Sequence, residues 1–297
     1  MDKKFAYLAI DKLEHKLEKE LKDFEKLDKL YLSNTVPDGV VWAQNVWYEP
    51  KLIKIKSISE GAKFLRSLQK NWALYPYKAV RRSMLIQESL AKIIKTISFY
   101  TKLPKINLGS WTLLDENTLL YSQTCSSSFS NGEVCFHETL EPPSRAYLKL
   151  WEAFTIMQKI PKEREKCLEI GSSPGSWSWV LANLNVDLMS VDKAPLDNSL
   201  NKFPNINFLQ KDAFAFLPEK LGRMDWIFSD LICYPEKLLA WIQKWLGFCD
   251  NFICTIKFQK DDHDGIIKEF QSIPDSKLIH LYNNKHELTW IKFKEIF

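Results

Sequence analysis

The stretch KCLEIGSSPGSWSWVLANLNVDLMSVDKAPLD, residues 166–197, decides the fold of this 297-residue chain. The apolar run 167–170 predicts a strand, the small residues after it predict a tight turn, and an apolar segment of helical length begins at Trp177. A second apolar run, 187–191, ends at Asp192. Strand, turn, helix and strand in this order predict half of a doubly wound nucleotide-binding unit, whose ligand crevice lies at the carboxyl ends of the strands.

The turn departs from the one that binds dinucleotides. That motif needs glycines at three set positions, whereas this turn has only Gly171 and Gly175, with Pro174 before the second. The departure disfavours a nicotinamide cofactor. A ligand without a pyrophosphate still needs an acceptor for its ribose hydroxyls, which Asp192 can provide, and S-adenosylmethionine (SAM) is such a ligand. The alternative is an ordinary strand-turn-helix of an α/β protein.

The composition is that of a globular protein, with 45% hydrophobic and 26% charged residues. The length allows one large or two ordinary domains, and we expect two. No apolar run is long enough to cross a bilayer and the N-terminus lacks the apolar core of a secretion signal, so we expect a cytoplasmic location and no membrane partner. The six cysteines form no CxxC pair, which favours buried free thiols over zinc sites or disulfides.

Basic residues gather in the N-terminal part of the chain. Residues 42–100 hold eleven Lys or Arg against three acidic residues, whereas residues 144–297 hold twenty of each. This pattern predicts contacts with RNA phosphates, and the interleaved Trp72, Tyr75 and Tyr77 predict stacking on unpaired bases. A solvated helix face would give the same charge pattern. The basic residues concerned are Lys51, Lys54, Lys56, Lys63, Arg66, Lys70, Lys78, Arg81 and Arg82.

Residues 1–141 predict a small, basic α/β domain. Apolar residues spaced like Leu13, Leu17 and Leu21 predict one amphipathic helix over 8–31. The patterns that follow predict strands over 39–48 and 52–58, helices over 60–69 and 83–98, and short strands over 106–136. The segment Glu141-Pro142-Pro143 predicts the boundary to a second domain, 142–297.

The second domain alternates strands and helices, which predicts a mostly parallel sheet. Beyond residue 197 we expect strands over 206–209, 224–229, 252–256, 277–282 and 288–293, and helices over 235–245 and 264–272. The last two strands are separated by the short segment 283–287, so they should form an antiparallel hairpin at one edge. The predicted fold is a Rossmann-like α/β sheet with an antiparallel C-terminal hairpin, joined to a smaller N-terminal α/β domain.

Polar residues follow or precede three of these strands. Asp230 comes after WIFS, Lys257 after FICTI, and Glu287 before LTWIKF, while Lys149 stands alone among apolar residues in the helical segment after the boundary. Ligands of open α/β sheets bind outside the carboxyl ends of the strands. We therefore expect Asp230, Lys257 and Glu287 to meet at the crevice, with Lys149 joining them from its helix.

Successive motifs of the second domain resemble those of the FtsJ-type RNA 2'-O-methyltransferases, in matching order and spacing. They are SRAYLKL, GSSPGSW, VDKAP, FLQKDAF, SDLICYPEK, TIKF and HELTW. Within that family the chain most resembles the RlmM type, which methylates a cytidine ribose in 23S ribosomal RNA. The resemblance implies a class I methyltransferase sheet and a SAM-dependent enzyme that acts on RNA. Ser176 departs from the family, which usually has a second glycine there. The first hundred residues are shorter than, and only weakly similar to, the family's RNA-binding THUMP domain.

The resemblance also implies a catalytic tetrad of Lys149, Asp230, Lys257 and Glu287. A ribose 2'-hydroxyl is a very weak acid, so its attack on a methyl group needs a positioned base, and we predict that Lys257 is that base. The neighbouring charge of Lys149 favours loss of a proton from Lys257, whereas the two carboxylates oppose it and are interpreted as orienting groups. The implied SAM site, with Asp192 on the ribose and Asp212 on the adenine amine, consists of Gly171, Ser173, Pro174, Gly175, Ser176, Trp177, Asp192, Asp212 and Asp230. No metal is expected, because no His or Cys cluster has ligand spacing.

Three functions from different classes stay open. The first is methylation of a ribose 2'-hydroxyl in 23S ribosomal RNA, or in a tRNA or mRNA. The second is a SAM enzyme that acts on a base or a protein, and the third is a non-catalytic RNA-binding relative. The complete tetrad favours the first. SDLICYPE also differs from the Asn/Asp-Pro-Pro-aromatic sequence that an amino-group methylase would carry after its fourth strand.

Overall fold

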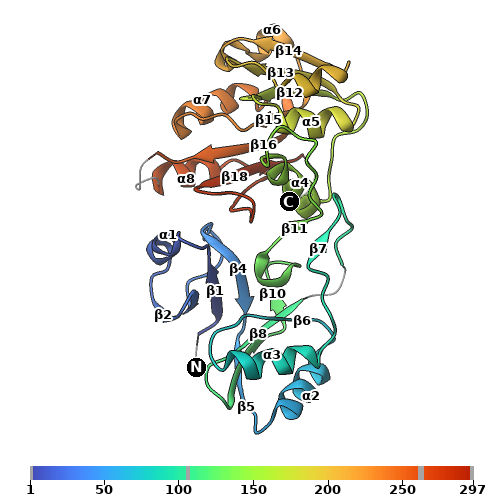
Figure 1. Ribbon diagram of the computed structural model, residues 1–297. Helices are drawn as coiled ribbons and strands as arrows, with labels where there is room; N and C mark the ends of the chain where they lie inside the picture. The colour runs from blue at the N-terminus through green and yellow to red at the C-terminus, as the bar shows by residue number, and fades with distance from the viewer. Residues whose placement is uncertain (1–2, 105–107, 260–263, 295–297) are drawn as a thin grey trace. The chain divides into compact units, whose positions relative to one another are not determined.

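The computed structural model describes residues 3–104, 108–259 and 264–294. The chain divides into two compact units, Met1–His137 and Glu138–Phe297 (Figure 1). The division lies a few residues before the predicted boundary at Glu141-Pro142-Pro143. Within the described ranges, no helix is both long enough and apolar enough to cross a membrane.

The C-terminal unit contains a seven-stranded sheet among its described residues, in the order β14-β13-β12-β15-β16-β18-β17. Neighbours from β14 to β16 are parallel, whereas β18 runs antiparallel to both β16 and β17. This arrangement confirms the predicted Rossmann-like sheet with an antiparallel hairpin at one edge. The strands are β12 (Lys166–Ile170), β13 (Asp187–Asp192), β14 (Ile206–Gln210), β15 (Met224–Ser229), β16 (Cys249–Lys257), β17 (Ser276–Ile279) and β18 (Glu287–Lys292).

Helices cover both faces of this sheet, which is why its central strands are largely apolar. In Figure 1, α4 and α5 lie on one face, and α7 and α8 lie on the other. The helices are α4 (Tyr147–Met157), α5 (Ser176–Asn183), α6 (Pro218–Leu221), α7 (Pro235–Trp245) and α8 (Asp264–Gln271), with short 3-10 turns η2 (Asn198–Lys202) and η3 (Ala213–Ala215).

Aromatic side chains on β15 fix α4 and α5 to the sheet. Trp226 and Phe228 are two residues apart, so they share one face of the strand, where their rings stack at 5.6 Å. Phe154 of α4 meets both rings edge-on at 6.1 and 6.0 Å, and Trp177 of α5 meets Phe228 edge-on at 6.5 Å. These contacts set the position of α4, which carries Lys149, and of α5, which follows the small-residue turn.

The described residues of the N-terminal unit form two larger sheets and one small one. Their orders are β10-β4-β1-β3-β2, β5-β9-β8-β6 and β11-β7. Its strands are β1 (Phe5–Ala9), β2 (Phe24–Leu27), β3 (Leu30–Ser33), β4 (Ala43–Tyr48), β5 (Lys51–Lys54), β6 (Trp72–Leu74), β7 (Thr96–Ile97), β8 (Gly109–Leu113), β9 (Thr118–Ser122), β10 (Thr124–Cys125) and β11 (Cys135–Phe136). Its helices are α1 (Glu14–Glu20), α2 (Ile58–Leu68), α3 (Val80–Glu88) and the 3-10 turn η1 (Ser130–Gly132). The unit is therefore mixed α/β, as predicted.

The predicted helix over 8–31 is wrong. Only α1 is helical there, and the residues after it form the hairpin of β2 and β3. Asp28 between those strands has a φ of +58°, the left-handed conformation that Asp tolerates better than most residues, so the chain reverses. Phe24 and Leu27 continue the helical spacing of the preceding segment by coincidence, because they belong to β2, which pairs with β3.

Two other N-terminal boundaries differ from the predictions. Ile58 belongs to α2 and not to the preceding strand, because Ser57 caps that helix by accepting a hydrogen bond from the Glu60 amide at 3.1 Å. Helix α3 ends at Glu88 and not near residue 98, since the Ser89 hydroxyl donates back to the Leu85 carbonyl oxygen at 3.2 Å. The predicted strands over 106–136 begin at Gly109, and residue 106 lies outside the described residues.

The aromatic packing on β15 predicts a strong effect on stability. Phe228 is fully buried, so Phe228→Ala should lower the free energy of unfolding by about 3–5 kcal/mol, because it removes buried surface and leaves a cavity. Phe248, which is 41% exposed, is the matched control, and Phe248→Ala should change stability by less than about 1 kcal/mol. Urea denaturation followed by tryptophan fluorescence measures both. Equal losses in the two variants would contradict this description of the core.

Candidate functional site

The carboxyl edge of the parallel strands brings three charged residues together. Asp230 directly follows β15, and Lys257 is the last residue of β16, the parallel neighbour of β15. Glu287 is the first residue of β18, and the antiparallel register pairs it with Lys257. Directly paired residues on neighbouring strands project to the same face of a sheet. The topology alone therefore places these side chains at one edge, as predicted from the sequence.

Lys149 of α4 completes the group. Its Nζ donates to Asp230 Oδ1 and Oδ2, both at 2.8 Å, and to Glu287 Oε1 at 2.9 Å. The Thr255 hydroxyl donates to Asp230 Oδ1 at 2.7 Å. The side chain of Lys149 is only 9% exposed. The four residues predicted as a tetrad thus form one partly buried cluster joined by hydrogen bonds and ion pairs.

Lys149 and Asp230 each stabilise the charged form of the other. Burial lowers the pKa of Lys149, but Asp230 and Glu287 outweigh it, so this pKa lies above its ordinary value. Burial raises the pKa of Asp230, but Lys149 and Lys257 outweigh it, so this pKa lies below its ordinary value. An ammonium held by two carboxylates keeps its proton, and Lys149 is therefore a fixed positive charge.

Lys257 occupies a different position in the cluster. Its Nζ donates to the backbone carbonyl oxygen of Asp230 at 2.6 Å and lies 3.0 Å from Asp230 Oδ1. Its side chain is 20% exposed, against 9% for Lys149. Lys149 contacts the carboxylates of both Asp230 and Glu287, whereas Lys257 pairs with the carboxylate of Asp230. Of the two amines, Lys257 is the one that a molecule entering from solvent reaches first.

The small-residue turn after β12 has the features of a ligand cradle. Gly171 has a φ of +73°, and a Cβ added there would lie 2.5 Å from the Leu231 Cα atom. Gly175 has a φ of +110°, which side chains rarely adopt. The Ser172 Oγ atom is buried and has no hydrogen-bond partner among the described residues. A buried hydroxyl without a partner is costly unless a ligand completes it, so the turn fits a bound cofactor.

Asp192 lies at the end of β13, beside this turn. Its Oδ2 accepts from the Ser173 amide at 3.0 Å, and its Oδ1 accepts from the Ala194 amide at 2.9 Å. These two bonds fix the orientation of the carboxylate. Each oxygen has a second lone pair, so Asp192 can still accept from two hydroxyl groups.

Other predicted cofactor residues turn their side chains away from a ligand. Ser176 is buried, and its hydroxyl is hydrogen-bonded to Ser144. Trp177 is 2% exposed and donates from its indole nitrogen to the Ala146 carbonyl oxygen at 2.9 Å. What Ser176 and Trp177 can offer a ligand is their backbone at the start of α5.

Pro174 lies before α5, and Asp212 is engaged in an ion pair. Pro174 precedes Gly175, the N-cap residue of α5, so it lies outside the first turn of that helix. Asp212 accepts from the Phe214 amide at 3.0 Å and pairs with Lys193 Nζ at 2.9 Å. Its side chain is half-exposed, so the Lys193 ion pair would have to open for Asp212 to accept from an adenine amine.

Two buried carboxyl groups near the site were missed by the sequence analysis. Glu169 in β12 accepts from the hydroxyls of Ser178 at 2.5 Å and Ser190 at 2.9 Å, and burial raises its pKa to about 8. Glu152 in α4 is equally buried, and burial raises its pKa to about 7. The signal in the sequence that could have indicated them is an acidic residue inside an apolar segment, which occurs at Glu169 and again at Glu152.

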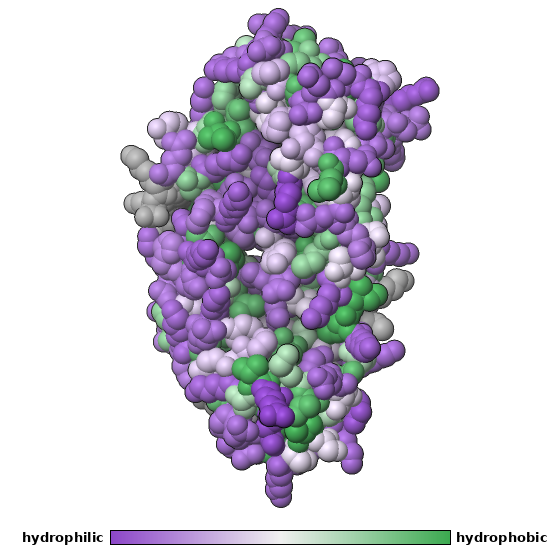
Figure 2. All heavy atoms as spheres, viewed as in Figure 1, coloured by the Kyte–Doolittle hydropathy of each residue, from purple (hydrophilic) through white to green (hydrophobic). Residues whose placement is uncertain are grey.

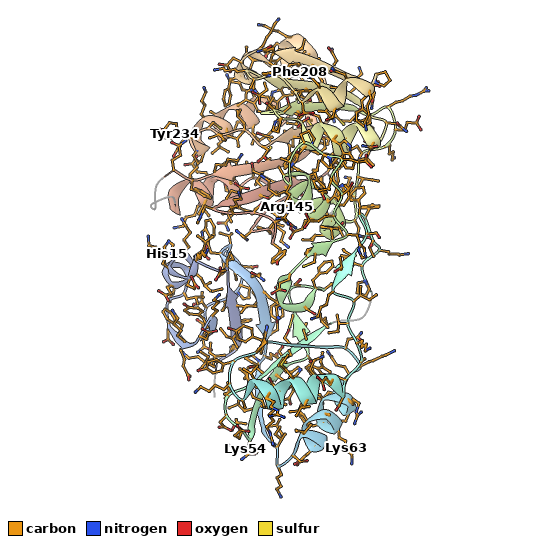
Figure 3. All side chains as sticks on the ribbon, viewed as in Figure 1. His15, Lys54, Lys63, Arg145, Phe208 and Tyr234 are labelled. Carbon is orange, nitrogen blue, oxygen red and sulfur yellow. The ribbon has the colours of Figure 1, made fainter. Side chains whose placement is uncertain are left out.

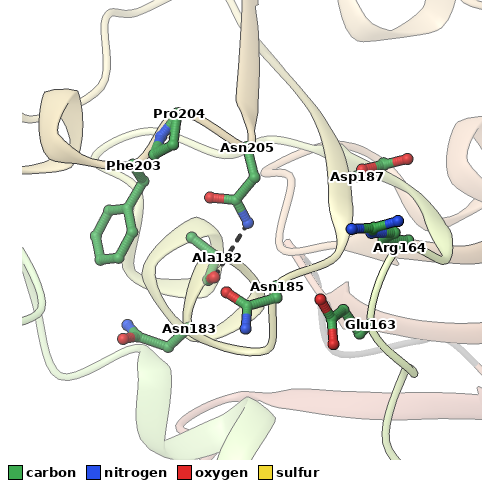
Figure 4. Close-up of a pocket in the computed structure, with 9 residues that line it drawn as sticks. All are labelled: Glu163, Arg164, Ala182, Asn183, Asn185, Asp187, Phe203, Pro204 and Asn205. Atoms are coloured by element: carbon green, nitrogen blue, oxygen red, sulfur yellow. Dashed lines mark hydrogen bonds between the residues drawn. The ribbon is translucent and has the colours of Figure 1, made fainter.

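A hollow of about 460 Å³ lies elsewhere on the C-terminal unit (Figure 4). Its residues precede or begin β12, β13 and β14, so it opens at the amino ends of strands whose carboxyl ends hold the small-residue turn and Asp192. It is therefore separate from the predicted cofactor residues and from the cluster of Lys149, Asp230, Lys257 and Glu287. The residues that line it are Glu163, Arg164, Ala182, Asn183, Asn185, Asp187, Phe203, Pro204 and Asn205.

Across the part of the chain that the structure describes, no group of three or more His, Cys, Asp or Glu side chains could hold a metal ion, and all six cysteines are free.

The N-terminal unit carries the basic residues predicted to contact RNA. Figure 3 shows Lys54 and Lys63 projecting from it, and hydrophilic side chains cover much of the visible surface of this unit in Figure 2. The exposed members of the set are Lys51, Lys54, Lys56, Lys63, Arg66, Lys70, Lys78 and Arg81. Arg82 is less exposed and lies 4.0 Å from Glu116.

The prediction that Trp72 and Tyr75 stack on bases is wrong. Trp72 is fully buried, and its indole nitrogen donates to the Leu65 carbonyl oxygen at 2.8 Å. Tyr75 is 9% exposed, and its hydroxyl donates to Asp28 at 2.6 Å. Both are core residues of the unit. Tyr77 is half-buried, with Lys78 Nζ 5.1 Å from its ring centroid.

Residues 142–286 match the family model of the FtsJ-like methyltransferases. The ribosomal RNA large subunit methyltransferase M of Aggregatibacter aphrophilus (strain NJ8700) is 28% identical over 170 residues, which cover 50% of this chain and 46% of that protein. The protein of the same name from Pasteurella multocida (strain Pm70) is 29% identical over 171 residues, with the same coverage. The chain spans about half the length of the curated relatives it matches. These findings confirm the resemblance to FtsJ-type enzymes over the C-terminal part of the chain.

The buried Glu169 predicts a dependence of stability on pH. Because its pKa rises from an ordinary 4.5 to about 8 on folding, its contribution to the free energy of unfolding is fully present below pH 4.5 and is lost as the pH rises through 8. Between these limits the free energy of unfolding of the wild type should fall by up to about 1.4 kcal/mol per pH unit more than that of Glu169→Gln. Urea denaturation from pH 5 to 8 measures the difference. Exposed Glu219→Gln is the control and should follow wild type, and a Glu169→Gln curve parallel to wild type would contradict the prediction.

Proposed function

We propose that the chain transfers the methyl group of SAM to a ribose 2'-hydroxyl of RNA, and that the substrate is a cytidine of 23S ribosomal RNA. The observation that carries the proposal is the partly buried cluster of Lys149, Asp230, Lys257 and Glu287 at the carboxyl edge of a class I methyltransferase sheet. The family match and the names of the relatives support RNA as the substrate. We also propose a cytoplasmic location.

SAM supplies an electrophilic methyl group, so the protein's task is to orient the 2'-hydroxyl and to take up its proton. We assign the proton to the amine of Lys257, the more exposed of the two lysines. The ammonium that results donates to the carbonyl oxygen of Asp230 at 2.6 Å and lies 3.0 Å from its Oδ1, so the charge formed in the reaction is stabilised in place. Lys149 retains its own proton and holds Asp230 and Glu287 in position.

The turn after β12 is the part of the chain that we propose holds the cofactor. Gly171 and Gly175 allow the positive φ angles that shape this turn, Ser172 offers a buried hydroxyl, and Asp192 offers two oriented acceptors for ribose hydroxyls. Asp212 is assigned to the adenine amine after release from Lys193. We expect no metal in the reaction, because transfer from a sulfonium needs no Lewis acid.

The proposal is tested by product analysis. The purified chain, radiolabelled SAM and unmodified 23S ribosomal RNA are incubated together, and the RNA is digested to nucleosides. We expect the label in 2'-O-methylcytidine. Label in a base-methylated nucleoside would contradict the assignment to ribose, label only in tRNA or mRNA would contradict the ribosomal substrate, and no label in any RNA would contradict the activity.

The role of Lys257 predicts the behaviour of two variants. Lys257→Ala should slow single-turnover methylation by about a hundred- to ten-thousandfold, the usual contribution of a general base, with little change in SAM affinity measured by calorimetry. Lys257→Arg keeps the charge but cannot take up the proton, so it should be equally inactive. An arginine variant with substantial activity and the wild-type dependence on pH would show that Lys257 is not the base.

The basic surface of the N-terminal unit predicts a separable effect on RNA binding. Replacing Lys63, Lys70 and Arg81 with Gln should weaken binding to RNAs of any sequence. Each lost contact with a single strand lowers the slope of log affinity against log salt by about 0.7, so the triple variant should lose about 2. SAM affinity should not change. The control replaces three exposed lysines of the C-terminal unit with Gln, namely Lys220, Lys244 and Lys268. If the slope of log affinity against log salt fell equally in both triple variants, the N-terminal unit would have no specific role in RNA binding.

A further inference from the structure

Glu152 is a buried carboxylate that the proposed chemistry does not use. It lies on α4 three residues after Lys149, so the two side chains are neighbours on the same face of the helix. Its Oε1 accepts from the Tyr282 amide at 2.7 Å. Its Oε2 accepts from the Asn283 amide at 2.8 Å and from the Asn283 side-chain Nδ2 at 2.7 Å. All three donors belong to the turn between β17 and β18.

That turn delivers Glu287 to the tetrad. Glu287 begins β18 directly after the turn, and its Oε1 accepts from Lys149 at 2.9 Å. Asn284 ties the turn to the strand, since its Nδ2 donates to the Glu287 carbonyl oxygen at 3.1 Å and to Thr289 Oγ1 at 3.0 Å. Helix α4 therefore holds this region at two points, with Lys149 on Glu287 itself and Glu152 on the residues just before it.

The chemistry of these contacts requires a carboxylate. Three N–H groups converge on Glu152, and both of its oxygens accept, which an amide cannot reproduce because one of its two ends carries only donors. Removing the acceptors leaves buried donors without partners, so the turn would move to find others. A 1% exposed carboxylate is costly to bury unless those donors compensate it.

We propose that Glu152 is a positioning residue, which clamps residues 282–283 to α4 so that Glu287 reaches Lys149 and completes the tetrad. This inference rests on the proposed function, in which Lys149 holds Asp230 and Glu287 in position around Lys257. Glu152 itself contacts neither the base nor the substrate, and it acts on methyl transfer only through Glu287.

A double-mutant cycle tests this dependence. Glu152→Gln should slow single-turnover methylation by about ten- to a hundredfold, since small displacements in an active site have effects of this size, and should leave SAM affinity within about threefold of wild type. In a Glu287→Gln background the same change should cost less than about threefold, because the two residues act as one unit. Independent, multiplicative losses would overturn the proposal. Exposed Glu236→Gln is the control.

A second arm needs no RNA and separates this inference from the proposed function. The crystal structure of Glu152→Gln should show the 2.9 Å bond between Lys149 Nζ and Glu287 Oε1 broken or lengthened, and an unchanged bond would overturn the inference. If Glu152→Gln does not fold, Asn283→Ala removes one of the three donors and should give a smaller loss of the same kind. If wild type methylates no RNA, the proposed function fails, while the crystal structure still decides whether Glu152 positions Glu287.

Discussion

A lysine buried inside a protein is stable only if opposite charges surround it, and this constraint organises the C-terminal unit. Lys149 is 7% exposed and is satisfied by Asp230 and Glu287. Those carboxylates come from residues 81 and 138 positions away in the sequence, so the ion pairs join α4 to the ends of β15 and β18. Breaking such a pair leaves an uncompensated charge, which typically costs about 3–5 kcal/mol. Stability and the geometry of the tetrad therefore depend on the same contacts.

The sheet supplies the rest of the geometry. Parallel strands bring Asp230 and Lys257 to one edge, and the antiparallel hairpin places Glu287 opposite Lys257. Stacked aromatics on β15 hold α4 against the sheet, so Lys149 is fixed from below while Glu152 fixes the hairpin turn beside it. A rigid framework of this kind leaves little freedom to the amine of Lys257, the lysine closer to solvent. Such a fixed orientation suits the role of base that we propose for it.

Much of the C-terminal unit was predictable because its signals are local. Each strand, the small-residue turn and the polar residue after each strand are read from short segments, and topology then gathers Asp230, Lys257 and Glu287. The hairpin of β2 and β3 was missed, because Phe24 and Leu27 continue the helical spacing of Leu13, Leu17 and Leu21, which lie in or cap the real helix α1. The burial of Trp72 and the hydrogen bond of Ser176 to Ser144 also depend on tertiary contacts. Glu152 carries no motif, so its link to Tyr282 and Asn283 is visible only in three dimensions.

The central claim is that this chain modifies a ribose in ribosomal RNA. The most direct measurement maps 2'-O-methylation at every nucleotide of ribosomal RNA from cells that contain the chain, from cells that lack it, and from cells with the Lys257→Ala variant in its place. The account predicts one cytidine of 23S ribosomal RNA that is methylated only in the first of the three. Identical maps in all three would contradict it.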